Sequence, residues 1–279
     1  ARDHGVEVRP VDVNVSEWDN TLERGFDGKL AVRLGFREIY GCRKEDVEKL
    51  TKARSFGYRS LHELWRKSGL GPAALETLAK ADAFGSLDLD RRRVLWQIHA
   101  LGEGQLPLFD GELVTPTEHG WPSHIPVEDL SAPLPEMSMG EHVLEDYHAL
   151  GLTLRAHPLK LLRHHLRPMN VTPNSGLATA KVDSRIKVAG VVLVRQRPGT
   201  ASGVIFMTLE DETGIANVVV WSHLFEQARG VVMTAKLIGC EGRLQIEGKP
   251  PHQVIHVVAE RLTDLTGLLQ SLREDSMAP

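Results

Sequence analysis

Three short apolar runs, rich in β-branched residues, follow one another in the C-terminal part of the chain. They are Val188–Val194, Val204–Leu209 and Ile215–Trp221. A basic stretch that contains glycine separates the first two, and the acidic turn Asp211–Gly214 separates the second from the third. Apolar runs of this length, bounded by glycine and turn residues, predict three consecutive β-strands. No other part of the chain restricts the fold as strongly.

The residues that follow extend this strand pattern. A helix-like segment is expected over Ser222–Arg229, and two more strands are expected over Thr234–Gln245 and His252–Arg261. Three strands, a short helix and two strands are the order of the OB-fold, a small five-stranded Greek-key barrel that usually holds oligonucleotides. Other small β-barrels share part of this pattern and OB-folds also bind proteins, so the strand pattern alone leaves the ligand open.

The loop between the first two expected strands favours nucleic acid. It reads RQRPGT over residues 195–200, with Arg195 and Arg197 as its two cations. In OB-folds this loop contacts the bound nucleic-acid strand. Guanidinium groups are well suited to bind phosphates and base edges. Phe206 and Trp221 could stack on bases. Strand alternation does not say which face looks outward, so a core position for either aromatic residue is the alternative.

Charge is distributed unevenly along the 279 residues, whose net charge is −4. Residues 31–100 hold fourteen Lys and Arg against nine Asp and Glu, and residues 151–279 hold fifteen against eleven. Residues 101–150 hold none against ten, and residues 1–30 hold four against seven. The two basic blocks would attract a phosphate backbone, whereas the acidic middle would repel it.

The first basic block predicts short helices separated by tight turns. The expected helices are Lys44–Ala53, Ser60–Lys67 and Ala73–Ala81. Gly69, Leu70 and Gly71 lie between the last two. A Gly-apolar-Gly turn between short helices is typical of a helix-hairpin-helix, in which glycine permits the tight turn and N–H groups at the start of the second helix hold a phosphate oxygen. An ordinary helix–turn–helix connection is the alternative.

Several segments resemble the bacterial error-prone DNA polymerases of the DnaE type (ImuC), which are C-family polymerases related to the DNA polymerase III alpha subunit. In chain order they are VEVRPVDVNVSEWD, LAKADAFGSLDLDRRRVLW, DYHALGLTLRAHPLKLLR, VRQRPGT and FMTLEDETGIANVVVW. Together they span nearly the whole chain, whereas TLEDETG alone also resembles the barrels of aminoacyl-tRNA synthetases and helicases. RQRPGT and RRRVLW are more similar to the error-prone branch than to the replicative alpha subunit.

The fold class expected from the pattern and the resemblance is α+β. An N-terminal helical domain with helix-hairpin-helix motifs is followed by an acidic Pro-rich linker and a C-terminal five-stranded OB-fold β-barrel. The expected boundaries are 1–30 for the end of an upstream, fingers-like polymerase region, 31–100 for a tandem helix-hairpin-helix domain, 101–145 for the linker, 146–180 for a helical connector, 181–267 for the OB-fold and 268–279 for a tail.

The resemblance places the Gly-Leu-Gly turn in the second of two hairpins that hold duplex DNA. In the first hairpin, Gly41-Cys42-Arg43, an arginine stands where a second glycine is expected. Because a long side chain resists the positive φ that glycine allows, we expect a distorted first hairpin. Arg43 and Lys44 would then reach phosphate with their side chains in place of the backbone.

The acidic segment 101–145 contains six prolines and few periodic apolar positions, which indicates an extended linker. Its QLPLF stretch, residues 105–109, resembles the bacterial sliding-clamp-binding pentapeptide. Leu108 and Phe109 would bury apolar surface, and Gln105 would form hydrogen bonds at the rim. The alternative is that Leu108 and Phe109 pack the linker against its own domain. The resemblance also implies an accessory polymerase-like protein that connects this family to the clamp.

Other residue combinations predict no catalytic or metal site. Those considered and set aside as ligands or nucleophiles are Cys42, Asp146, His157, His164, His165 and Cys240. Adjacent histidines point to different helix faces, and two distant cysteines lack the spacing of a zinc site, so we expect reduced structural thiols. The resemblance implies that the catalytic aspartates and the Mg²⁺ of the parent polymerase lie outside this fragment, which has no cofactor of its own.

The sequence therefore predicts the DNA-binding C-terminal portion of an error-prone, translesion DNA polymerase. Its partners would be duplex and single-stranded DNA in the bacterial cytoplasm, in association with the nucleoid, and no membrane. Three alternatives remain open: the corresponding region of the replicative alpha subunit, a stand-alone non-enzymatic module that binds single-stranded nucleic acid, and the anticodon-binding barrel of a tRNA synthetase.

Overall fold

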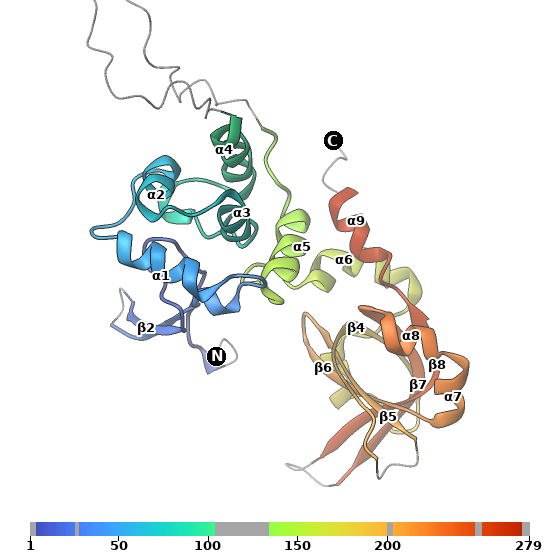
Figure 1. Cartoon of the computed structure of the whole chain (residues 1–279). Coiled ribbons are helices and arrows are strands. Elements are labelled where there is room, and N and C mark those ends of the chain that lie inside the picture. Colours follow the sequence, from blue (N-terminus) through green and yellow to red (C-terminus); the bar gives the residue numbers. More distant parts are fainter. Residues whose placement is uncertain (1–3, 26–27, 104–133, 200–202, 249–252, 275–279) are drawn as a thin grey trace, which may run out of the picture. The chain divides into compact units, whose positions relative to one another are not determined.

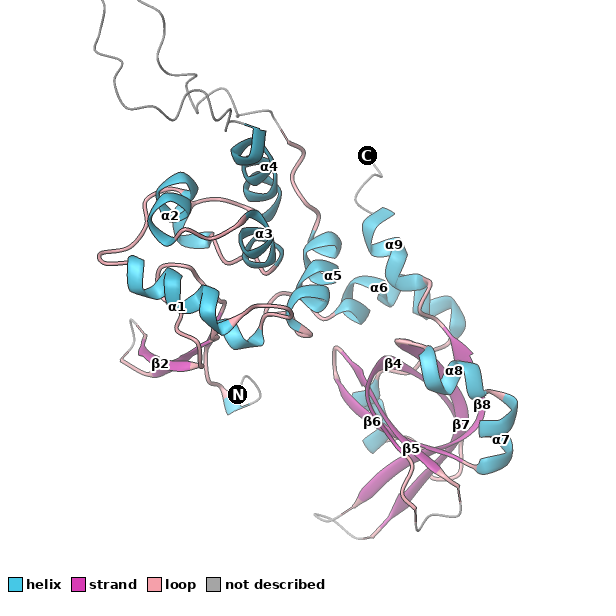
Figure 2. Cartoon of the chain, viewed as in Figure 1, coloured by secondary structure: helices cyan, strands magenta, loops and turns pink. Residues whose placement is uncertain are grey.

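The computed structural model describes residues 4–25, 28–103, 134–199, 203–248 and 253–274 (Figures 1 and 2). The chain divides into two compact units. Unit 1 comprises residues 1–137 and 145–154, and unit 2 comprises residues 138–144 and 155–279.

Unit 1 begins with a small sheet of order β1-β3-β2, built from β1 (Val8–Arg9), β2 (Thr21–Arg24) and β3 (Leu30–Arg33). β1 runs parallel to β3, and β2 runs antiparallel to it. Glu23 accepts hydrogen bonds from Arg33 and Arg9, at 2.8 and 2.9 Å, and these bonds lower the pKa of its carboxyl. The sheet is thereby tied together across all three strands.

The helices of unit 1 pack around one hydrophobic core. They are the 3-10 turn η2 (Phe36–Glu38), α1 (Lys44–Ala53), α2 (Leu61–Ser68), α3 (Pro72–Lys80), the 3-10 turn η3 (Gly85–Leu87) and α4 (Arg91–Glu103). The three expected helices are thus present, and α1 has the expected bounds. Ser60 caps α2, since its Oγ accepts the N–H of Glu63 at 3.1 Å.

Two boundaries in the first half of the chain differ from those expected. Val11 and Val13 lie in the same core as the helices, so residues before 31 are not a separate body from the helical domain. Helix α5 (Met139–Leu150) begins inside the expected linker. Ser138 and Glu141 form a reciprocal capping box, with hydrogen bonds of 2.8 and 3.1 Å, and this box starts the helix where the sequence S-x-x-E permits it.

A buried ion pair fixes the end of unit 1. Arg91 donates to an oxygen of Asp146 at 2.7 Å, and their side chains are 1% and 5% exposed. The other carboxylate oxygen accepts the hydroxyl of Thr153 at 2.7 Å. Asp146 is therefore a structural partner of α4.

Unit 2 contains a closed barrel of order β4-β5-β6-β8-β7 (Figure 1). Its strands are β4 (Arg185–Gln196), β5 (Ile205–Asp211), β6 (Gly214–Val220), β7 (Leu237–Glu247) and β8 (Val254–Asp264). All neighbours are antiparallel except β6 and β8, which are parallel. The short helices α7 (Ser222–Gln227) and α8 (Arg229–Thr234) connect β6 to β7. The expected five-stranded OB-fold is confirmed.

Unit 2 also contains helices before and after the barrel strands. They are α6 (Pro158–Leu166), the 3-10 turns η5 (Arg167–Met169) and η6 (Asn174–Ala178), and α9 (Leu268–Glu274). Leu162 of α6 and Leu272 of α9 share a small core with Ala189 of β4. The expected tail at 268–279 therefore starts with a helix that is packed on the barrel.

Arg163 of α6 binds the turn between β5 and β6. Its guanidinium donates to Asp211 at 3.0 Å and to Glu212 at 2.6 and 2.7 Å. The backbone N–H of Asn174 donates to the same Asp211 oxygen at 2.8 Å. This network holds the β5–β6 hairpin against α6 and uses the acidic turn for structure.

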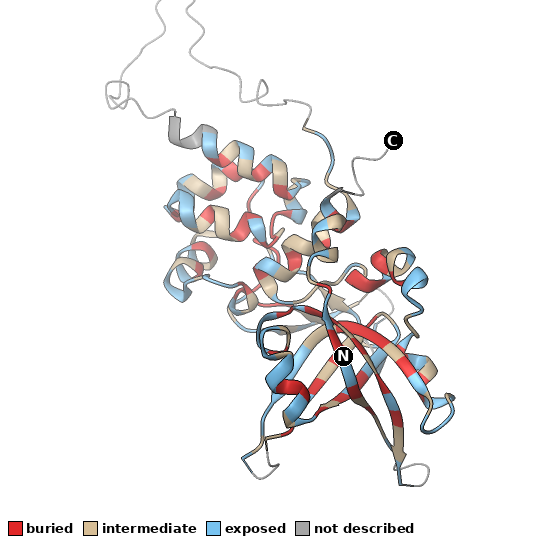
Figure 3. Ribbon diagram, turned by 90° about the vertical axis from the view of Figure 1, so that its right-hand side faces the viewer, coloured by how far each residue is buried: buried red, intermediate tan, exposed pale blue. Residues whose placement is uncertain are grey.

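Burial alternates along the barrel strands (Figure 3). In β5, Ile205, Met207 and Leu209 are buried in the barrel core, whereas Phe206 between them is exposed. β4 and β5 approach each other closely at Gly190, where an added Cβ would lie 2.8 Å from the backbone N and O of Glu210. The two strands can approach this closely because Gly190 has no side chain.

The close approach predicts the effect of Gly190→Ala. We expect the free energy of unfolding to fall by about 1–3 kcal/mol, because β4 and β5 must move apart. Gly230→Ala in α8 is the matched control, since nothing lies within 4 Å of a Cβ there and alanine suits a helix better than glycine. Urea unfolding measures the free energy of unfolding of both variants and of the parent chain. Equal stability of Gly190→Ala and the parent chain would contradict this account.

Candidate nucleic-acid interface

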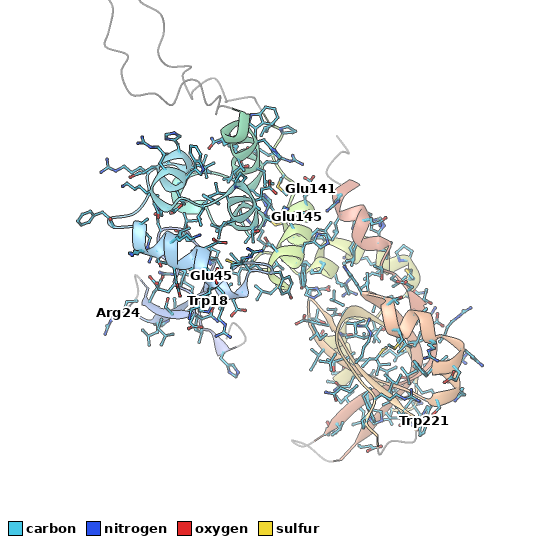
Figure 4. All side chains as sticks on the ribbon, viewed as in Figure 1. Trp18, Arg24, Glu45, Glu141, Glu145 and Trp221 are labelled. Carbon is cyan, nitrogen blue, oxygen red and sulfur yellow. The ribbon has the colours of Figure 1, made fainter. Side chains whose placement is uncertain are left out.

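The outward face of β5 and β6 carries two large aromatic side chains. Phe206 is 42% exposed and Trp221 is 49% exposed. Trp221, which follows β6 directly, is labelled in Figure 4. Phe206 pairs with Val219, and Trp221 lies two residues further on the same face. The two aromatic residues are therefore diagonal neighbours, a separation that large side chains can span. The sequence left open whether each aromatic residue lies in the core or faces outward. In the structure both face outward.

Polar side chains continue this outward face. Thr208 of β5 pairs with Asn217 of β6, and Asn217 pairs with His256 of β8. Gln245 of β7 pairs with His256, and their side chains lie 3.1 Å apart. The row thus offers hydrogen-bonding groups beside the aromatic pair, and sequence reasoning missed it because the register of β8 was unknown.

Arg195 lies on β4, not in the loop, and its guanidinium is bound within the protein. It donates to the carbonyl of Val232 at 2.6 Å and to that of Ala235 at the end of α8. Burial lowers the pKa of Arg195. A phosphate contact by this residue stays a prediction, and it would compete with both carbonyls.

Arg197 begins the loop and has a different environment. Its guanidinium carbon lies 5.3 Å from the ring centroid of Phe225 in α7, which is within cation–π range. The loop returns at Gly203, whose φ is +83°, and an added Cβ would lie 3.0 Å from the hydroxyl of Ser222. The described ends of the loop thus lie against the start of α7, directly beside Trp221. Thr200 lies outside the described residues.

The second hairpin of unit 1 has a tight turn at Gly69 and an extended residue at Gly71. Gly69 ends α2 in the left-handed region, with φ +65°, and its N–H donates to the carbonyl of Trp65 at 3.0 Å. Leu70 is 2% exposed and packs in the core of unit 1. Gly71 begins α3 with φ −73° and ψ 161°, and no side chain caps this helix start. Pro72 has no N–H, and the N–H of Ala74 donates to the carbonyl of Gly71 at 3.1 Å. The N–H of Ala73 remains open to an anion.

The expectation of a distorted first hairpin is wrong. Gly41 has φ +77°, as Gly69 has in the second hairpin, but Arg43 is extended, with φ −99° and ψ 134°. Gly71 is extended as well, so the third position of the turn does not require a positive φ. An arginine fits there without strain, and no side chain caps the start of α1. Arg43 and Lys44 are both exposed.

The two hairpins lie side by side. A cavity of about 190 Å³ is lined by residues 41–43 of the first hairpin and by Leu70, Ala73 and Thr77 of the second hairpin and α3. The uncapped starts of α1 and α3 therefore belong to one surface. The clamp-like residues Gln105, Leu108 and Phe109 lie outside the described residues, so their role stays a prediction.

One of the histidines set aside in the sequence, His157, has a structural role. His157 caps α6, since its Nδ1 accepts the N–H of Leu159 at 3.2 Å, and burial lowers its pKa. Among the residues that the structure describes, no group of three His, Cys, Asp or Glu side chains is placed to hold a metal ion. Within the same residues, no helix is long and apolar enough to cross a membrane.

Family comparisons agree with the two folds. Residues 5–94 match the family of the helix-hairpin-helix motif, and residues 186–265 match that of the OB-fold nucleic acid binding domain. The chain therefore combines these two domain types.

A solved asparaginyl-tRNA synthetase from Pyrococcus horikoshii is 24% identical over 30% of this chain and 20% of its own, with a TM-score of 0.25.

Similarity to whole proteins is more specific. The chain is 48% identical over 277 residues to the error-prone DNA polymerase of Ruegeria pomeroyi, covering 98% of this chain and 23% of that protein. It is 44% identical over 295 residues to the error-prone DNA polymerase of Mesorhizobium japonicum, covering 98% and 25%. The chain is thus related, over nearly its whole length, to the error-prone DNA polymerases, and it spans about a quarter of their length.

The environments of the two cysteines predict slow chemical modification. Burial raises the pKa of the Cys42 thiol to about 11 and that of Cys240 to about 12. Because only the thiolate attacks an alkylating agent, we expect both to react at pH 8 more than roughly 100-fold slower than a free cysteine, whose pKa is about 8.5. Mass spectrometry after iodoacetamide treatment measures this, with the urea-unfolded chain as the control. Rapid labelling of the folded chain would contradict the expectation.

Proposed function

We propose that this chain is the DNA-binding C-terminal portion of an error-prone, translesion DNA-directed DNA polymerase. Unit 2 binds the unpaired template on the outward face of β5 and β6, and unit 1 holds duplex DNA through its two hairpins. The observation that carries the proposal is the exposure of Phe206 and Trp221 as neighbours on a closed OB barrel. The relation to error-prone DNA polymerases supports the choice of DNA.

The barrel face has the chemistry of a stacking platform. In OB-folds the second and third strands and the loop before the second form the oligonucleotide surface, and these correspond to β5, β6 and the segment after β4. Each base stacked on an aromatic side chain contributes roughly 1–3 kcal/mol, independently of its sequence. A polymerase that copies damaged template benefits from such sequence-tolerant binding, because altered bases retain a stacking face.

The hairpins support duplex binding through backbone groups. The uncapped starts of α1 and α3 present N–H groups together with the positive ends of two helix dipoles. Arg43 and Lys44 add side-chain cations beside the first of them. Contacts of this kind bind the phosphate backbone independently of base sequence. This property suits a polymerase, which must hold product duplex of any sequence.

The parent enzyme would transfer nucleotidyl groups with Mg²⁺ held by carboxylates outside this chain. The chain's own part is to hold DNA, and we assign it no catalytic residue. Gln105, Leu108 and Phe109 would bind the sliding clamp, and an accessory polymerase-like protein would assist. The setting would be the cytoplasm of a bacterium, at the nucleoid.

The barrel proposal predicts the effect of Phe206→Ala and Trp221→Ala on single-strand affinity. Each change should weaken binding of oligo-dT to the full chain by about 1–3 kcal/mol, because a stacking surface is lost. Fluorescence anisotropy over a range of salt concentrations measures the affinity. Trp96→Ala on α4, where the tryptophan is 46% exposed, is the matched control. Unchanged affinity in folded Phe206→Ala and Trp221→Ala variants would contradict the proposal.

The hairpin proposal predicts that Gly71→Glu abolishes duplex binding while oligo-dT binding persists. Nothing lies within 4 Å of a Cβ at this extended glycine, so the chain should fold, and the carboxylate would repel a phosphate at the start of α3. Gln270→Glu on the exposed side of α9 adds the same charge elsewhere and should leave duplex affinity unchanged. Equal duplex affinity of Gly71→Glu and the parent chain would disprove the hairpin contact.

A further inference from the structure

One buried aromatic ring in unit 2 is in contact with two guanidinium groups. Phe225 of α7 is 3% exposed. The guanidinium carbon of Arg197 lies 5.3 Å from its ring centroid, and that of Arg229 lies 5.7 Å from it. Arg197 follows β4 and Arg229 begins α8, so the fold brings together two cations that are distant in the sequence.

Both arginines are exposed, and neither has a carboxylate partner in the part of the chain that the structure describes. Three other arginines of unit 2 differ in this respect. Arg163 binds Asp211 and Glu212, and Arg185 and Arg243 both bind Glu260; these pairs are at 2.6–3.2 Å. The two guanidiniums on Phe225 are thus held by the ring, with no hydrogen-bond acceptor among the described residues.

Two like charges on one ring repel each other, and a cation–π contact at an exposed site contributes only about 0.5–1 kcal/mol. An anion between them would convert this repulsion into attraction. A phosphate group suits the position, since each guanidinium offers several N–H donors in a rigid planar fork that matches phosphate oxygens. Glu226, the carboxylate next to the ring in the sequence, is exposed and bound to neither arginine.

The pair lies at the end of the aromatic face. An added Cβ at Gly203 would be 3.0 Å from the hydroxyl of Ser222 and 3.5 Å from a terminal nitrogen of Arg197. Ser222 follows Trp221 directly. Arg197 is therefore placed beside the Trp221 end of the platform, within reach of the backbone of a strand whose bases stack there.

We propose that Arg197 and Arg229 together bind a backbone phosphate of the single strand, and that Phe225 is a positioning residue whose ring contacts both guanidiniums. The proposal rests on the single-strand binding proposed for the barrel. It adds Arg229, which lies outside the loop and the strands from which the sequence predicted contacts, and it directs the strand from Phe206 and Trp221 toward the junction of α7 and α8.

Arg229→Gln in the full chain tests the proposal with oligo-dT as the probe. We expect roughly tenfold weaker binding at low salt and a shallower salt dependence. The slope of log K against log salt should fall by a part of the roughly 0.7 that belongs to one phosphate contact, because Arg197 still contacts the same phosphate. Arg229→Lys should restore most of the slope because the charge returns. Arg261→Gln on β8 is the matched control: it removes an equal charge from an exposed barrel position and should leave the slope unchanged.

A double variant and a ring variant test the shared phosphate. If both arginines contact one group, Arg197→Gln/Arg229→Gln should weaken binding by less than the product of the two single effects. Phe225→Leu, checked for folding by circular dichroism, should reduce the slope although both charges remain. A purely structural role of the ring would leave the slope of the folded variant unchanged.

Wild-type affinity and slope in Arg229→Gln would overturn the inference. If Phe206→Ala and Trp221→Ala still weaken binding in that case, the proposed function of the barrel stands and only the phosphate pair is lost. If the unmodified chain does not bind oligo-dT at all, both proposals fall.

Discussion

Closure of five strands into a barrel is the constraint on which the rest of unit 2 depends. Every strand pairs on both sides, so successive side chains alternate between a filled core and the outer surface. The exposure of Phe206 follows from the burial of its neighbours Ile205 and Met207. Closure in turn requires glycine where strands approach, as at Gly190, and at Gly242, whose missing side chain leaves room for the carbonyl of Val258.

The positive charges of unit 2 indicate where DNA could bind only after the partners of each arginine within the protein are known. Arg163 is bound by two carboxylates and Arg195 by two backbone carbonyls, so much of the positive charge of unit 2 stabilises its own fold. Arg197 and Arg229 differ because an aromatic ring, not an acid, holds them. The same basic sequence block therefore contains structural arginines and arginines with open donors, and counting charges cannot separate them.

The sequence predicted the order of elements well, because strand runs and Gly-apolar-Gly turns are local signals. It predicted the tight turn at Gly69 for the same reason. It could not assign faces to Phe206 and Trp221, because the face depends on pairing with other strands. Arg43 was misjudged since the conformation of its hairpin position was assumed to be that of the preceding glycine. The early start of α5 was overlooked, although Ser138 and Glu141 carry the signal of a capping box.

The most direct test of the central claim is photo-cross-linking of a 5-iodouracil oligonucleotide to the full chain, with the adducts located by mass spectrometry. Contact between unpaired bases and the outward face of β5 and β6 predicts that the main adducts form at Phe206 and Trp221. Adducts confined to the β7 and β8 surface around Arg243 and Arg261, or to unit 1, would contradict it.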